Sequence, residues 1–218
     1  MDDILIRNLT QLELEHFTKC LADCFEHKFQ YIFKGIPKEE YKVILRELIL
    51  AVQNPANPFP GEFIAVSNGS SDNLNDNNHI LGCLTVKIPS FKEEYDKEAW
   101  KVLRNHFSYL KRLRIGILLG ALSKKIRDLE SDELYIDSIC VFEKYRGKGY
   151  GSQLLNFCVE FAKSNKLKKV SLWVSSVNHN AIKLYTKLGF IIRKAKKSRI
   201  TKKNLNIPAF YYMVKELR

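Results

Sequence analysis

Residues 133–165 combine a strand, a glycine-rich loop and a helix, and they constrain the fold more than any other segment. The segment ELYIDSICVF (133–142) is rich in the β-branched and aromatic residues of strands. The loop YRGKGYG (145–151) holds three of the ten glycines of the chain at alternate positions. The segment SQLLNFCVEFAKSN (152–165) keeps one helical face apolar. Since glycine weakens regular elements, its concentration here indicates that bare backbone approaches something closely.

This order of elements favours a phosphate ligand. Backbone N–H groups at a helix N-terminus point outward, and the helix dipole favours an anion there. A Cβ at positions 147, 149 or 151 would hold a phosphate away from those donors, and two basic side chains add charge. We therefore predict a pyrophosphate on the backbone of Arg146, Gly147, Lys148, Gly149, Tyr150, Gly151 and Ser152. A tight turn without a ligand is the competing interpretation.

Two common nucleotide-binding motifs do not fit this loop. A Walker A motif needs glycine where Phe142 stands, and serine or threonine where Gly149 stands. A dinucleotide-binding fingerprint needs glycine or alanine where Ser152 stands, and it follows the first strand of its βαβ unit rather than lying late in the chain.

Periodicity elsewhere predicts an α/β (α+β) protein. We expect further strands at 4–10, 62–67, 79–88, 168–175, 190–194 and 209–217, and further helices at 11–25, 37–53 and 178–190. The strands at 62–67 and 79–88 form a hairpin around the polar turn cluster 68–78. Residues 91–131 have a helical pattern and form an insertion before the central strand, which either covers the core or walls a substrate pocket. Its Trp100, Phe107, Tyr109 and Leu110 are expected to pack against other parts of the protein.

Composition indicates a soluble globular protein. The 218 residues are 45% hydrophobic and suit a single domain spanning 1–218. No stretch is long and apolar enough to span a bilayer, and the N-terminus lacks a secretory signal, so we expect a cytoplasmic protein without membrane contact. The net charge is +12, and part of it lies in a basic cluster at 193–203. This cluster either faces solvent or binds an acidic ligand or nucleic acid.

The five cysteines are expected to be buried reduced thiols. Cys20 and Cys24 share a helical face, but no second pair or histidine cluster completes a zinc site in the sequence. We therefore predict no metal.

Two motifs together resemble the GNAT superfamily of N-acetyltransferases. The loop resembles the family's acetyl-coenzyme A motif [R/Q]-x-x-G-x-[G/A] through Arg146, Gly149 and Gly151. A second family segment, N-x-x-A-x-x-L-Y-x-x-x-G-F, is matched by Asn178, Ala181, Leu184, Tyr185, Gly189 and Phe190. Glu143 departs from the proline that many members have at its position. The resemblance implies a mixed sheet of about seven strands that splays at the cofactor site, with helices on both faces.

The resemblance also implies acetyl transfer from acetyl-CoA to a primary amine by direct attack in a ternary complex. The pantetheine arm is expected to pair with the backbone around Ile139, Cys140 and Val141, beside a bulge near 138–140 that turns an N–H toward the thioester. Asn178 and Asn180 either bond the arm's amides or cap a helix.

Tyr185 is the implied general acid, because a phenol can protonate the leaving thiolate. Asp137 is the predicted base, directly or through water, and shares an expected face with Glu133 and Tyr135. The glutamate base of the histone-modifying branch corresponds to Tyr135 here, so that role is not transferred.

The sequence allows a second function and more than one oligomeric state. The competing function is a non-catalytic CoA-sensing or nucleic-acid-binding module on the same fold, although nucleic acid is not favoured, because no aromatic residues interleave the basic cluster. The chain is expected to be a monomer or a homodimer.

Overall fold

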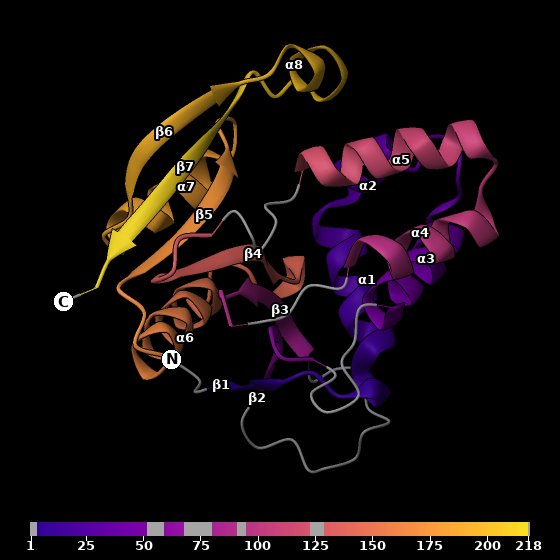
Figure 1. Cartoon of the computed structure of the whole chain (residues 1–218). Coiled ribbons are helices and arrows are strands. Elements are labelled where there is room, and N and C mark those ends of the chain that lie inside the picture. Colours follow the sequence, from indigo (N-terminus) through magenta and orange to yellow (C-terminus); the bar gives the residue numbers. More distant parts are fainter. Residues whose placement is uncertain (1–3, 52–58, 68–79, 91–94, 123–128, 218) are drawn as a thin grey trace.

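The computed structural model describes residues 4–51, 59–67, 80–90, 95–122 and 129–217 (Figure 1). Within them, seven strands form one sheet in the order β1-β2-β3-β4-β5-β7-β6. Only β4 and β5 pair in parallel. The strands are β1 (Ile4–Asn8), β2 (Glu62–Ser67), β3 (Ile80–Lys87), β4 (Glu133–Val141), β5 (Lys169–Ser175), β6 (Ile191–Lys197) and β7 (Ala209–Glu216). The predicted fold class and the β2–β3 hairpin are confirmed, while the single-domain organisation stays a prediction.

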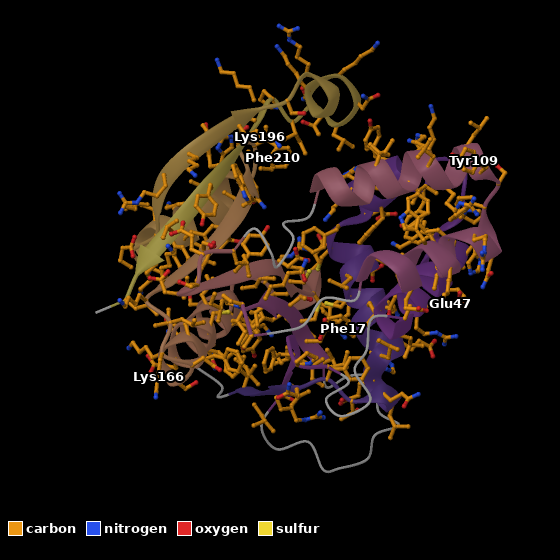
Figure 2. All side chains as sticks on the ribbon, viewed as in Figure 1. Phe17, Glu47, Tyr109, Lys166, Lys196 and Phe210 are labelled. Carbon is orange, nitrogen blue, oxygen red and sulfur yellow. The ribbon has the colours of Figure 1, made fainter. Side chains whose placement is uncertain are left out.

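Helices cover both faces of the sheet (Figure 1). On one face, α6 and α7 enclose an apolar core with Leu134 and Ile136 of β4. On the other face, α1 packs against the sheet through Phe17 (Figure 2). Beyond α1, the helices α2, α3, α4 and α5 share a core in which the rings of Phe33 and Tyr41 stack with centroids 5.6 Å apart. The helices are α1 (Leu14–Cys24), α2 (Glu26–Ile32), α3 (Lys38–Ala51), α4 (Tyr95–His106), α5 (Tyr109–Leu122), α6 (Tyr150–Ser164), α7 (His179–Lys187) and α8 (Arg199–Leu205).

The predicted helical insertion at 91–131 is two helices, α4 and α5, separated at Phe107 and Ser108. Phe107 is buried, as expected, but Tyr109 and Leu110 are 67% and 78% exposed, so their predicted packing is wrong (Figure 2). They begin the outer side of α5, whose inward side packs through Ile115. Residues 129–132 form a bend and turn rather than helix, and 91–94 and 123–128 lie outside the described residues.

Two short helices were not predicted. The helix expected at 11–25 is followed directly by α2, which buries Phe29 and Ile32 in the helical core. The expected turn between the last two strands contains α8, which begins after the cap Ser198, whose hydroxyl accepts from the Thr201 N–H. Both helices have seven residues, too few to show a clear period. No helix in the described part of the chain is both long and apolar enough to cross a bilayer.

The close approach of β3 to β4 depends on Gly82. A Cβ at this position would lie 2.3 Å from the backbone oxygen of Cys140, which cannot move without separating the strands. Gly116 of α5 is a useful contrast, because its Cβ would meet only the ring of Trp100, 2.9 Å away, and that side chain is 40% exposed.

We expect Gly82→Ala to lower the free energy of unfolding by about 1–3 kcal/mol, because the added methyl overpacks against backbone. Gly116→Ala is expected to be neutral or stabilising by up to about 1 kcal/mol, because the Trp100 ring can move and alanine favours helix. Urea unfolding followed by circular dichroism measures both. Equal losses in the two variants would contradict this account of the β3–β4 contact.

Candidate active site

The central feature of the site is the parting of β4 and β5. The two strands pair only from Glu133 to Ile136 on β4 and from Lys169 to Leu172 on β5. Beyond this point β4 continues against β3 to Val141, while β5 continues against β7 to Ser175. Residues 137–141 therefore present a strand edge toward β5 to which no described strand is paired. This confirms the predicted splay, and an edge of this kind can accept an extended ligand.

A bulge lies where the two strands separate. Thr85 of β3 pairs with Ser138, but the next residue, Val86, pairs with Ile136, so Asp137 is the extra residue of β4. The observed bulge therefore lies one residue before the predicted range of 138–140. The reason is that the bulge accompanies the loss of the β5 partner after Ile136, a pairing that the sequence of β4 alone does not reveal. Bulges redirect neighbouring backbone groups, as the interpretation required.

The glycine loop leaves a run of backbone donors without partners. Gly147 and Gly149 have φ values of +80° and +88°, in the left-handed region that glycine tolerates best, and α6 begins directly after Gly149. The N–H groups of Arg146 and Ser152 are used locally, by the carbonyls of Glu143 and Gly149. The five N–H groups between them, at 147–151, have no hydrogen-bond partner among the described residues. Such donors at a helix N-terminus suit an anion.

The two basic side chains of the loop lie differently from each other. Arg146 donates from Nε to the carbonyl of Val141 at 3.1 Å, so it ties the loop to the end of β4. The Lys148 ammonium lies 5.7 Å from the ring centroid of Tyr145. Both side chains are exposed and stay within reach of an anion at the loop.

Tyr185 lies on α7 and packs in the same apolar core that Ile139 and Val141 border. The start of α6 is close by, because a Cβ on Gly151 would lie 3.3 Å from Leu184. Burial raises the pKa of Tyr185 above its usual value, so the hydroxyl keeps its proton at neutral pH. That hydroxyl has no hydrogen-bond partner among the described residues. It is therefore available to donate a proton to a ligand.

The structure separates the two asparagines of the second motif. Asn178 caps α7, because its Oδ1 accepts from the Ala181 N–H at 3.2 Å. Asn180 lies in the first turn of α7 and is exposed. Gly189, with φ of +88°, follows the C-terminal end of the helix as expected.

A polar cluster on the α1 face of the sheet contains Asp137. We define it as Lys28, Glu62, Lys87 and Asp137. Lys87 Nζ lies 3.5 Å from Asp137 Oδ1. Burial lowers the pKa of Lys28 while the charge of Asp137 opposes this shift, and burial raises the pKa of Glu62 to about 7. Glu62 and both lysines were not predicted as site residues, because they come from β2, β3 and α2, far from Asp137 in the chain.

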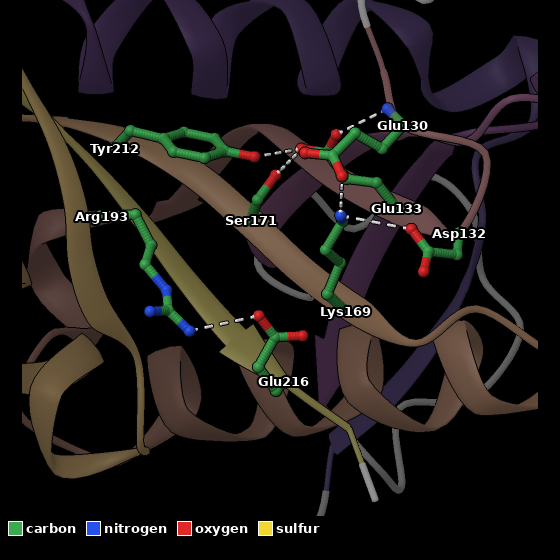
Figure 3. A network of polar contacts seen from close by, with 8 residues as sticks. All are labelled: Glu130, Asp132, Glu133, Lys169, Ser171, Arg193, Tyr212 and Glu216. Atoms are coloured by element: carbon green, nitrogen blue, oxygen red, sulfur yellow. Dashed lines mark hydrogen bonds and ion pairs between the residues drawn. The ribbon is translucent and has the colours of Figure 1, made fainter.

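Glu133 belongs to a buried network rather than to a catalytic centre (Figure 3). Its carboxylate accepts from the hydroxyls of Ser171 and Tyr212 and from the N–H of Glu130. The side chain is fully buried, so these donors replace water. Because they come from β5, β7 and the segment before β4, the network holds together the paired end of the two strands.

The basic cluster at 193–203 lies on β6 and α8, and every residue of β6 is exposed. β6 is an edge strand of the sheet. Charged edge strands resist pairing with other chains, which gives these lysines a role without nucleic acid. Lys196 is among them (Figure 2).

The five cysteines are free thiols, and all but the partly exposed Cys24 are buried, as expected. The sulfur atoms of Cys20, Cys24 and Cys140 all lie within 4.8 Å of one another, so a group with the spacing of metal ligands is present. The sequence spacing did not indicate this group, because β4 brings Cys140 to Cys20 and Cys24 across more than half the chain.

Comparison with known proteins identifies what this architecture resembles. The family model described as the acetyltransferase (GNAT) family matches residues 73–190. An uncharacterized N-acetyltransferase of Methanocaldococcus jannaschii is 33% identical over 112 residues, which cover 45% of this chain and 49% of that protein. The chain spans about half the length of the curated relatives it matches or less.

Solved structures show the same fold. A crystal structure of an acetyltransferase aligns with a TM-score of 0.65 at 20% identity, covering 98% of this chain and 100% of that one. The NatC complex, solved with Gag peptide and CoA bound, contains a chain that aligns with a TM-score of 0.54 at 17% identity, with 99% of both chains covered.

The partly buried Glu62 predicts a pH dependence of stability. Its pKa in the folded chain is about 7, above the ordinary value of 4.5. The unfolded chain therefore loses this proton at lower pH than the folded chain does. The stabilisation from protonated Glu62 is complete below pH 4.5 and is lost as the pH rises to about 7.

Glu62→Gln removes this loss, because glutamine does not titrate. We expect the unfolding free energy of the variant, relative to the parent chain, to rise by on the order of 1–3 kcal/mol from acidic to mildly alkaline pH. Urea unfolding across that range measures the difference, with exposed Glu216→Gln as the control that should stay flat. Parallel stability curves for Glu62→Gln and the parent would refute the shifted pKa.

Proposed function

The chain belongs to the GNAT acetyltransferase family, and from this membership we propose that it transfers an acetyl group from acetyl-CoA to a primary amine. The acceptor is an amine of a small molecule, a peptide or a protein. The observation that carries the proposal is the placement of unpartnered loop amides beside an unpaired strand edge, with the Tyr185 hydroxyl in the adjoining core.

The loop and the strand edge fit the two polar parts of acetyl-CoA. The N–H groups of 147–151 supply donors for the pyrophosphate, and the edge of β4 at Ile139 and Val141 supplies peptide groups for the pantetheine amides. Family membership makes acetyl-CoA the expected acetyl donor, and the NatC structure with CoA is consistent with it.

The transfer joins the amine nitrogen to the thioester carbonyl carbon and breaks the carbon–sulfur bond. The Tyr185 hydroxyl, which burial keeps protonated, donates a hydrogen bond to the departing sulfur. A proton that Tyr185 transfers along this bond is replaced by the proton that the base takes from the amine. A backbone N–H beside the Asp137 bulge stabilises the negative charge that develops on the carbonyl oxygen.

The polar cluster supplies the group that removes the amine proton. Asp137 is the proposed base, held in place by Lys87. Glu62 is the second candidate, because a carboxyl with a pKa of about 7 is matched to proton transfer near neutral pH. If Asp137 is the base, Asp137→Asn abolishes the acid limb of the pH–rate profile while Glu62→Gln retains it; the reverse result assigns the base to Glu62.

The cofactor site is tested by a matched pair of glycine variants. Gly147 and Gly35 have φ values of +80° and +81°, and a Cβ at either would meet nothing within 4 Å. Alanine therefore introduces similar backbone strain at both, about 1–2 kcal/mol. Only Gly147→Ala places a methyl group among the loop donors, so we expect it to weaken acetyl-CoA binding at least about tenfold, a loss of 1.4 kcal/mol.

Isothermal titration with acetyl-CoA measures this effect, and Gly35→Ala should bind like the parent chain. No binding by the parent at millimolar acetyl-CoA would remove the proposal, as would equal effects of the two substitutions.

Turnover is tested with Tyr185→Phe. We expect a drop in kcat of about 10²-fold or more, the usual size of a general-acid contribution, with acetyl-CoA affinity retained. Tyr109→Phe, at an exposed position of α5, is the control and should keep full activity. Thiol release across a panel of amines, with mass spectrometry of the acetylated product, gives the rates. Acetyl-CoA binding without thiol release for any amine would instead indicate a non-catalytic CoA-sensing module.

A further inference from the structure

Four cysteines from three elements meet on the α1 face of the sheet. Cys20 and Cys24 are one turn apart on α1 and face the same direction. Cys83 on β3 is directly opposite Cys140 on β4 in the antiparallel register, so their side chains share a face. The sulfurs of Cys20, Cys24 and Cys140 lie within 4.8 Å of one another. Cys158 is separate, in the core beneath α6.

The surroundings of this cluster are apolar. Cys20 and Cys140 are 0% and 3% exposed, among residues such as Phe17 and Ile64. Cys24 is partly exposed and forms the outer edge of the group. A buried cluster of thiols is a poor hydrogen-bonding arrangement, because S–H groups are weak donors. Apolar packing therefore does not explain why three sulfurs converge.

We propose that Cys20, Cys24 and Cys140 bind a Zn²⁺ ion that fastens α1 to β4. Three thiolates favour a soft or borderline cation, and Zn²⁺ with sulfur ligands is tetrahedral with Zn–S bonds of about 2.3 Å. Those bonds place the sulfurs about 3.8 Å apart, so the present spacing of up to 4.8 Å closes with small rotations of the side chains.

The thiolate is the form that ligates a metal, so binding of Zn²⁺ releases the thiol protons of the three ligands. Cys24, at the exposed edge, provides the entry path.

The charge of the filled site is partly offset by Arg146. Three thiolates and one Zn²⁺ leave a net charge of −1, which is costly in an apolar region unless it is paired. The Arg146 Nε donates to the carbonyl of Val141, and the same carbonyl accepts from the Cys24 thiol, so the guanidinium lies near the site. The proposed ion lies on the opposite face of β4 from Ile139 and Val141, and its role is structural.

The test measures metal bound to the reduced, purified chain. Zinc content is determined by mass spectrometry of the elements, and Co²⁺ titration reports thiolate ligands through their charge-transfer absorption. We expect one equivalent per chain and a rise in Tm on adding Zn²⁺. Cys20→Ser should weaken Co²⁺ binding by more than about 100-fold, since even outer-shell partners of a metal ligand are worth 10–100-fold.

Two further variants keep the result interpretable. Cys158→Ser alters an equally buried cysteine outside the cluster and should bind metal like the parent chain. Cys24→Ser tests a ligand that is partly exposed, in case Cys20→Ser fails to fold. Any of three results would overturn the proposal. These are unchanged Co²⁺ binding in Cys24→Ser, absence of thiolate absorption in the parent, and a Cys20–Cys140 disulfide in protein isolated without reductant, which would assign the cluster to redox chemistry.

Discussion

β4 and β5 run side by side only between Glu133 and Ile136, and the geometry of the site depends on where they separate. At the closed end, Glu133 accepts hydrogen bonds from Ser171 of β5 and Tyr212 of β7, which fixes both strands to one carboxylate. At the open end, the bulge at Asp137 coincides with the loss of the partner strand. Backbone groups on the free edge need hydrogen-bond partners from water or a ligand, so the parting offers peptide groups that an extended ligand can bond without any special side chain.

Functional groups surround this opening on both faces of the sheet. On the α6 face, the glycine loop leads from β4 into the helix and sets five amides next to the free edge, while α7 brings Tyr185 into the adjoining core. On the α1 face lies the polar cluster of Lys28, Glu62, Lys87 and Asp137. In the proposed mechanism the acetyl donor and the acceptor amine therefore approach β4 from opposite faces.

The parts of this arrangement that were predictable have local causes. Alternation and helical period specify β4, α6 and β5 within a few residues, and the positive φ values of Gly147 and Gly149 agree with the glycine spacing. The short helices α2 and α8 were missed because seven residues carry little periodicity. The exposure of Tyr109 and Leu110 was mispredicted because the helical pattern does not state which side of α5 meets the core.

The missed site residues have non-local causes. Glu62 is ordinary in sequence, and its raised pKa arises only when β2 and β3 place it in a partly buried position near Asp137. Glu133 and Asp137 both lie on β4, yet only the carboxylate of Glu133 accepts hydrogen bonds from Ser171 and Tyr212. Cys140 joins Cys20 and Cys24 through tertiary packing alone. In each case the role of the residue depends on a partner that is distant in the sequence, so the spacing of residues along the chain cannot predict it.

Amide chemical-shift mapping of the ¹⁵N-labelled chain during titration with CoA tests the central claim most directly. If the ligand occupies the parting of the strands, the largest changes fall on the amides of 147–151 and on Ile139 and Val141. Residues of β1 and β6, at the sheet edges, should be unaffected. Saturable binding that leaves the loop amides unshifted, with changes gathered elsewhere, would contradict the account.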